Sequence, residues 1–116
     1  MEQATQTTGL PRLNAPAPDF TAVTTHGVKS LADYRGKWLV LFSHPADFTP
    51  VCTTEFTAFA RAHEDFKALN CELLGLSIDS LFVHVAWVLN IKEKFGVYIN
   101  FPNIEDLKMD VAQAYG

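Results

Sequence analysis

Two apolar segments of strand length, separated by a helical pattern, constrain the fold more than any other feature of this sequence. Residues 38–42 (WLVLF) and 71–79 (CELLGLSID) are the apolar segments, and such continuous runs are typical of strands buried on both faces. We therefore expect both strands to be central in a sheet. Residues 53–70 between them repeat apolar side chains at helical spacing, namely Phe56, Phe59, Phe66 and Leu69. This order predicts a β-α-β unit, whose right-handed crossover makes the two strands parallel.

Weaker signals surround this unit. Residues 19–27 alternate like a short strand that runs into a turn, and residues 30–36 read as one helical turn. Residues 81–95 predict a second long helix, and residues 106–116 a short one capped by Asp106. The order of elements predicts an α/β fold, in which helices flank a central sheet. Because only two central strands are predicted, the domain is expected to be incomplete at its C-terminus.

Composition excludes several classes of function. A net charge of −4 provides no basic surface for nucleic acid. No stretch approaches the roughly 18 uninterrupted apolar residues that cross a bilayer, and residues 1–15 predict a loosely docked arm before one domain at residues 16–116. The chain is therefore expected in the cytoplasm, with no membrane contact. Its two cysteines should stay reduced there, and they lack the spacing of a zinc site.

Cys52 occupies the most informative position in the sequence. Pro45 ends the first buried strand, and Thr49 followed by Pro50 is a favourable helix start, with a hydroxyl cap before a proline at the first helical position. Cys52 would then be the third helical residue, where free backbone N–H groups and the helix dipole favour thiolate over thiol. The alternative is a small buried side chain that only packs. The position favours a reactive cysteine.

The segment SHPADFTPVCTTE resembles the peroxidatic-cysteine motif of the peroxiredoxins, Pro-x-x-x-Thr/Ser-x-x-Cys, at Pro45, Thr49 and Cys52. The preceding His44 and the following TTE resemble the subfamily that includes the one-cysteine enzymes. The similarity continues through LLGLSIDS, HVAW, NIKEKFG and DLKMDVAQAYG, and so covers residues 16–116. It implies a thioredoxin-like fold and the reduction of hydrogen peroxide and organic hydroperoxides without a metal or any other cofactor.

The resemblance also implies a role for each residue of the motif. The Cys52 thiolate would attack the peroxide and become sulfenic acid, which an external thiol reductant would restore. Thr49 would align the peroxide, and Pro45 would shield the cysteine from water. His44 would lie beside the sulfur. The alternative is a histidine at the end of the strand that only hydrogen-bonds to the backbone. Glu55 would orient an arginine of the site, unless it only suits the helix dipole.

The sequence departs from the family pattern in one respect. By resemblance, the essential arginine lies on a later strand than any present here, and Arg12, Arg35 and Arg61 fall in segments that do not match that strand. We therefore expect a truncated peroxiredoxin with impaired activity, whose full-length parent forms a homodimer or a larger homo-oligomer. The alternative function is a non-catalytic thioredoxin-like fragment that acts through assembly or peptide binding. Cys71, at the start of the second strand, is interpreted as a buried structural thiol.

The remaining histidines are given no part in chemistry. His26 is interpreted as solvent-exposed, His63 as a residue on a helix face, and His84 as a packing residue. The second long helix is apolar almost all round, which predicts that it buries more than one side. Core packing is the favoured interpretation of Val83 and Leu89, and the alternative is that they cover another surface or meet a partner chain.

Overall fold

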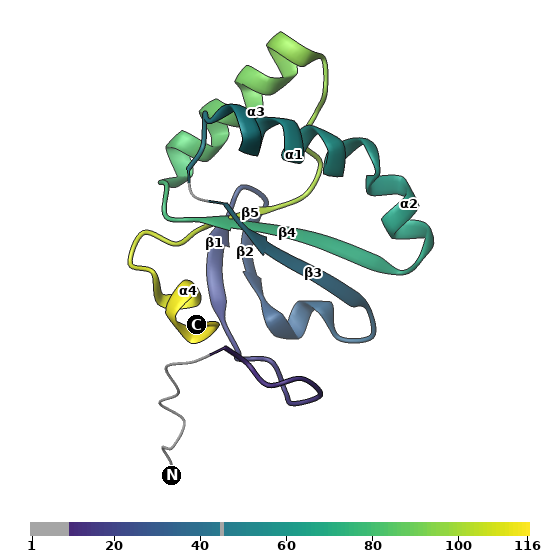
Figure 1. Ribbon diagram of the computed structural model, residues 1–116, viewed down its shortest axis with the longest axis vertical. Helices are drawn as coiled ribbons and strands as arrows, with labels where there is room; N and C mark the ends of the chain where they lie inside the picture. Colours follow the sequence, from purple (N-terminus) through teal and green to yellow (C-terminus); the bar gives the residue numbers. More distant parts are fainter. Residues whose placement is uncertain (1–9, 45) are drawn as a thin grey trace.

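The computed structural model describes residues 10–44 and 46–116, apart from the side chain of residue 51 (Figure 1). Pro45 and most of the predicted N-terminal arm therefore lie outside the described residues. Five strands form one mixed sheet in the order β2-β1-β5-β4-β3. The strands are β1 (Thr21–Thr24), β2 (Gly27–Ser30), β3 (Trp38–Ser43), β4 (Cys71–Ser77) and β5 (Asn103–Glu105). The helices are α1 (Pro50–Arg61), α2 (His63–Ala68), α3 (Leu81–Phe95) and α4 (Asp110–Ala114), with one 3₁₀ turn, η2, at Leu31–Tyr34.

The predicted β-α-β unit is confirmed. β3 and β4 run parallel, with Trp38 opposite Cys71 at one end and Ser43 opposite Leu76 at the other. The connection is not one helix, because α1 ends at Arg61 and α2 begins at His63. Leu69 was expected on the apolar face of this connection, but it follows the end of α2 and is 74% exposed. Helical spacing therefore predicted the apolar face correctly as far as Phe66, two residues before the end of α2.

The predicted central position of β3 is wrong. Within the described residues β3 pairs with β4 alone and forms one edge of the sheet, while Trp38 is 75% exposed. The predicted burial of β3 on both faces is also wrong, because its residues are half-buried or exposed. An apolar run does not say which strands lie beside it. β4 is central, as predicted, and its side chains Leu73 and Leu74 are fully buried.

The sheet is wider than predicted because two short strands gave no clear signal. β5 is three residues long and lies between β4, to which it is parallel, and β1, to which it is antiparallel. β2 occupies residues that the sequence suggested were a turn, and it pairs antiparallel with β1. Segments of three or four residues are too short for a period of two to be recognised.

The ends of the long helix α3 agree with the sequence. Ser80 Oγ accepts a hydrogen bond from the Val83 N–H at its start, and Gly96 closes its end with a φ of 67°, a conformation that suits glycine. α4 is shorter than the predicted helix at residues 106–116, and its N-cap residue is Met109. The Asp106 carboxylate still serves the start of the helix, since it accepts hydrogen bonds from the N–H groups of Val111 and Ala112.

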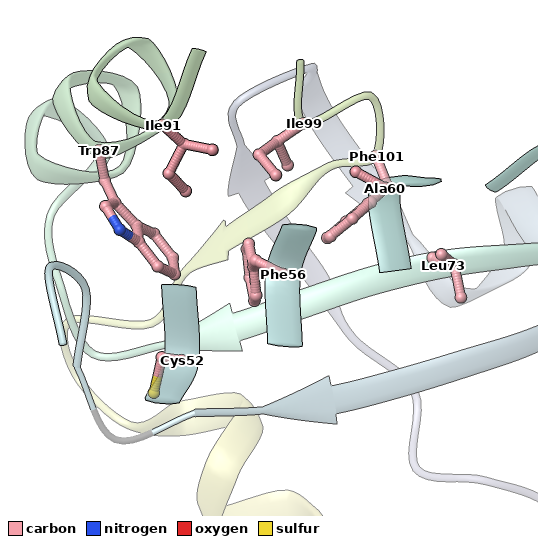
Figure 2. Close-up of a cluster of buried hydrophobic side chains, with 8 residues drawn as sticks. All are labelled: Cys52, Phe56, Ala60, Leu73, Trp87, Ile91, Ile99 and Phe101. Atoms are coloured by element: carbon pink, nitrogen blue, oxygen red, sulfur yellow. The ribbon is translucent and has the colours of Figure 1, made fainter. Parts of the chain in front are cut away.

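The sheet separates two hydrophobic clusters. The upper cluster lies between the sheet and helices α1 and α3 (Figure 2), and consists of Cys52, Phe56, Ala60, Leu73, Trp87, Ile91, Ile99 and Phe101. The lower cluster lies on the opposite face, next to α4, and consists of Phe20, Tyr34, Leu74, Leu76, Ile104 and Val111. Core packing of Val83 and Leu89 is wrong, because they are 37% and 62% exposed. α3 instead packs through His84, Trp87 and Ile91, which share one helix face.

Candidate active site

Cys52 lies where the chain passes from β3 into α1. It is the third residue of α1, as the sequence predicted, and only 4% of its surface is exposed. Figure 2 shows it at the start of the helix, one turn before Phe56 and across from Trp87. The thiol therefore lies at the border of the upper cluster, close to the first turn of α1. Reactive cysteines are often found in the first turn of a helix, because free N–H groups and the helix dipole stabilise a negative charge there.

The loop before α1 holds its start in an uncommon conformation. Thr49 is the N-cap, but its hydroxyl donates to the Ala46 carbonyl oxygen at 3.0 Å instead of capping a helix N–H. Thr49 was predicted as a hydroxyl cap, and this part of the prediction is wrong because the side chain closes the preceding turn. Phe48 has a φ of 61°, which is costly for a bulky residue. Such strain commonly accompanies functional loops.

The other residues of the motif are placed less tightly. Glu55 is exposed on α1, and its carboxylate makes no hydrogen bond or ion pair with the described residues. Arg12, Arg35 and Arg61 are likewise exposed. Pro45 lies outside the described residues. The roles assigned to Pro45 and Glu55 therefore stay predictions.

A buried hydrogen-bonded network borders the cluster that contains Cys52, since the His44 ring packs against Phe56 and Trp87 of that cluster. His44 Nε2 donates to Asp47 Oδ1 at 2.6 Å, and His84 Nδ1 donates to Asp47 Oδ2, also at 2.6 Å. His84 Nε2 donates to the Ile104 carbonyl oxygen at 2.9 Å, and the Asn103 amide lies 3.2 Å from His84 Nδ1. The side chains of Asp47 and His84 are fully buried. His44 is therefore bound to a carboxylate, and its side chain does not make the backbone bond considered as an alternative.

Asp47 and His84 shift each other's ionisation. Burial alone raises the pKa of Asp47, but the hydrogen bonds from His44 and His84 outweigh it and lower the pKa below its ordinary value. Burial alone lowers the pKa of His84, but the hydrogen bond and the charge of Asp47 outweigh it and raise that pKa. The favoured state is a buried carboxylate paired with an imidazolium, each fully hydrogen-bonded.

Helix α3 connects this network to α1. Trp87 lies one turn after His84, and its Nε1–H donates to Thr53 Oγ1 at 3.0 Å, next to Cys52 in the chain. The His44 ring packs against Phe56 and Trp87, with ring centroids 4.8 and 5.2 Å away. Trp87 on α3 therefore contacts Thr53, which follows Cys52 in the chain, and His44, which precedes the cysteine loop.

The parts of the network that come from Asp47 and His84 were not predicted from the sequence. His84 was interpreted as a packing residue and is fully buried, but both of its ring nitrogens also make hydrogen bonds that packing does not explain. A histidine on the buried face of an apolar helix needs polar partners. That requirement, together with an aspartate in the loop after a buried strand, was the available signal.

The remaining thiol and histidines are simpler. Cys71 is buried and unpaired, as predicted for a structural thiol. His26 is exposed, also as predicted. His63 was expected on a helix face, but it is buried on α2 with its ring centroid 6.4 Å from that of Phe101. None of them joins the network around Asp47.

One group among the described residues has donor atoms close enough to suggest a metal site. The donor atoms of His44, Asp47 and Asp79 lie within 4.8 Å of one another. Both Asp47 oxygens already accept short hydrogen bonds from histidines, and Asp79 Oδ2 accepts from the Asp47 N–H and from Ser77 Oγ. The arrangement is therefore a self-contained hydrogen-bonded network.

A parallel β-α-β unit with a cysteine in the first turn of its crossover helix defines a class of thioredoxin-like thiol proteins. The chain belongs to the AhpC/TSA family, which it matches over residues 13–116. It is 64% identical over 108 residues to a peroxiredoxin of Aquifex aeolicus, covering 92% of this chain and 49% of the relative. It is 59% identical over 103 residues to peroxiredoxin 2 of Picrophilus torridus, covering 89% and 51%.

Solved structures give the same result. A yeast mitochondrial 1-Cys peroxiredoxin superposes with a TM-score of 0.82 at 48% identity, over 89% of this chain and 49% of that one. Peroxiredoxin 6 of Arenicola marina gives 0.81 at 37% identity, over 88% and 48%. The predicted peroxiredoxin resemblance and thioredoxin-like fold are confirmed, and the chain spans about half the length of the curated relatives it matches. Over residues 10–44 and 46–116, no helix is both long and apolar enough to cross a membrane.

Proposed function

We propose that this chain carries the peroxidatic site of a thiol-dependent peroxidase that reduces hydrogen peroxide and organic hydroperoxides. The observation that carries the proposal is the position of Cys52 in the first turn of α1, in a chain of the AhpC/TSA family. The Cys52 thiolate attacks one peroxide oxygen and the O–O bond breaks. The sulfur becomes sulfenic acid, and the leaving oxygen takes up a proton to give water or an alcohol.

The other motif residues support this step in the proposal. The Thr49 hydroxyl gives its only proton to the Ala46 carbonyl, so its oxygen is left to accept a hydrogen bond from the O–H of the peroxide. His44 lies in the buried network next to the cysteine loop. Pro45 shields the sulfur from water. Glu55 orients an arginine other than Arg12, Arg35 and Arg61.

The proposal includes partners and a location. An external thiol reductant, either a thioredoxin-like protein or a small thiol, restores the cysteine; the yeast relative is described with glutathione and thioredoxin systems. A second copy of the chain is a further partner, supported by large exposed apolar side chains such as Phe82. Two unpaired thiols favour the cytoplasm. Residues 16–116 form the N-terminal part of the peroxiredoxin domain, and residues 1–15 form an arm.

Trapping of the sulfenic acid tests the proposal directly. The chain is exposed to hydrogen peroxide with a sulfenic-acid trap such as dimedone, and adducts are located by peptide mass spectrometry while peroxide loss is followed. We expect the adduct on Cys52, its loss in Cys52→Ser, and its retention in the matched control Cys71→Ala. Unchanged peroxide consumption by Cys52→Ser would contradict the proposal.

A further inference from the structure

His84 is a fully buried histidine whose two ring nitrogens are both committed. Nε2 donates to the Ile104 carbonyl oxygen at the end of β5, and Nδ1 donates to Asp47 Oδ2. A carbonyl oxygen and an ionised carboxylate are both acceptors, so both nitrogens carry protons. The residue is therefore fixed in orientation from both sides, which packing alone does not require.

Asp47 transmits this constraint to His44. Its second oxygen, Oδ1, accepts from His44 Nε2, and its backbone N–H donates to Asp79 Oδ2 at 2.8 Å. Two bonds therefore hold the Asp47 carboxylate, and a third holds its backbone. Because a carboxylate accepts and does not donate, it selects the His44 tautomer that carries its proton on Nε2.

The other nitrogen of His44 is then an acceptor. Nδ1 is buried, and it has no hydrogen-bond partner among the described residues. The ring packs against Phe56 and Trp87, which belong to the same buried cluster as Cys52. An unpartnered buried acceptor costs free energy, so its presence in a native structure needs an explanation.

We propose that His84 is a positioning residue of the peroxidatic site, which acts through Asp47 to hold His44 in one tautomer, with Nδ1 as a buried acceptor in the cluster around Cys52. The effect on Cys52 chemistry rests on the proposed function, whereas the effect on the His44 tautomer does not. His84 itself is separated from His44 by the Asp47 carboxylate. Its effect on the thiol is therefore indirect.

The charges around His84 favour this arrangement. Asp47 from the loop after β3 and Asp79 from the loop after β4 both favour its cationic form. β5 is followed by Asp106, which caps α4, and ends in Glu105, whose carboxylate accepts from the Leu81 N–H at the start of α3. His44, which follows β3, is the other titratable group bonded to Asp47, and its ring centroid lies 6.4 Å from that of His84. No described lysine or arginine side chain is bonded to Asp47, so the two histidines are its partners.

Three substitutions of His84 separate positioning from packing. The amide nitrogen of asparagine can take the place of Nδ1, so His84→Asn keeps a donor for Asp47. The amide nitrogen of glutamine can take the place of Nε2, so His84→Gln keeps only the bond to Ile104. His84→Phe keeps the ring and loses both bonds. Asparagine and glutamine differ by one methylene, which makes them matched controls for polarity.

Nitrogen-15 NMR of the His44 imidazole reports the positioning without any peroxide. We expect the Nε2-protonated tautomer in the wild type and in His84→Asn, and a mixture of tautomers in His84→Gln and His84→Phe. The same single tautomer in all four proteins would overturn the proposal. If His84→Phe does not fold, the comparison of asparagine with glutamine still decides.

The rate of Cys52 oxidation by hydrogen peroxide, measured from pH 5 to 8, reports the consequence. We expect His84→Gln to slow oxidation about tenfold and to change its pH profile, and His84→Asn to stay within about threefold of the wild type. Equal slowing by both variants would assign His84 to packing, and slowing by His84→Asn alone would assign it to the Ile104 bond. Either result would overturn the proposal. If Cys52→Ser still consumes peroxide at the wild-type rate, the proposed function fails, whereas the tautomer measurement still decides the role of His84.

Discussion

Asp47 is the residue on which the buried polar side chains of this protein converge. Its carboxylate receives hydrogen bonds from two histidines, and its backbone N–H is bound by a third side chain. A buried carboxylate is unfavourable by itself, and only complete hydrogen bonding makes it stable. Removal of its charge should therefore change the stability of the fold, with a pH dependence that the pKa shifts determine.

We expect Asp47→Asn to lower the free energy of unfolding by about 2 kcal/mol near pH 5 to 6, and by less at both lower and higher pH. Folding lowers the pKa of Asp47 from 3.8, so its contribution is present above that value and is lost as pH falls through the folded pKa. Folding raises the pKa of His84 from 6.5, so its contribution is present below that value and is lost as pH rises through the folded pKa.

Urea denaturation of both proteins across pH 3 to 9 checks this expectation. Glu93→Gln, which removes an exposed carboxylate from α3, is the control and should follow the wild type. A difference between wild type and Asp47→Asn that stays constant across this range would show that the charges of the pair do not stabilise the fold.

Single residues were predictable where local chemistry sets their position. Thr49, Pro50 and Cys52 were placed on the first turn of α1 from the sequence, since capping and proline preferences act within a few residues. His84 and Asp47 are 37 residues apart in the chain, so no local preference could pair them. Their contact depends on how α3 lies over the sheet.

At the scale of elements, the site depends on the close approach of β4, β5 and α1. Gly75 on β4 lies where these elements meet, opposite Asn103 on β5. A Cβ atom at this position would be 2.8 Å from Asn103 Oδ1 and 3.0 Å from Phe56 Cζ. Neither side chain can move easily, because both are buried. Glycine therefore sets the distance between the sheet and the helix that carries Cys52.

Gly75→Ala should destabilise the protein by about 2 kcal/mol or more, because overpacking displaces Phe56 or Asn103. Urea denaturation measures the loss. Gly96→Ala is a useful comparison, since its Cβ would meet no atom within 4 Å and only the backbone φ of 67° opposes it, at about 1 kcal/mol. In an Asn103→Ala background the cost of Gly75→Ala should shrink. An equal cost in both backgrounds would exclude the clash with Asn103.

Elements were predicted well where the sequence marks their ends. The bounds of α3 agree with the predicted residues 81–95, which Gly96 ends. β4 begins at Cys71 as predicted but ends at Ser77, two residues before the predicted end. The break between α1 and α2 and the strand β5 were missed, since neither interrupts nor extends a recognisable period. These misses matter for the site, because β5 supplies Ile104 to His84.

At the scale of the whole molecule, the two edges of the sheet differ. β2 forms one edge with four residues, including Lys29, and β3 forms the other with six mostly apolar residues. The backbone N–H groups of Trp38 and His44 donate to the carbonyl oxygens of Asn70 and Leu76. Because N–H groups alternate in direction along a strand, those of every second residue of β3 point away from β4. Long apolar edges invite pairing with another chain, whereas a lysine discourages it.

The edge of β3 should therefore govern the proposed self-association of this chain. Trp38→Lys places a charge on that edge and removes an aromatic side chain that is 75% exposed. Sedimentation velocity at equal protein concentration should therefore show a larger monomer fraction for this variant than for the wild type. Val28→Lys makes the same kind of change on β2 and should leave the distribution as it is. If the two variants dissociate the protein equally, general charge repulsion explains the effect; if neither does, the association uses another surface, such as the exposed side chains of α3.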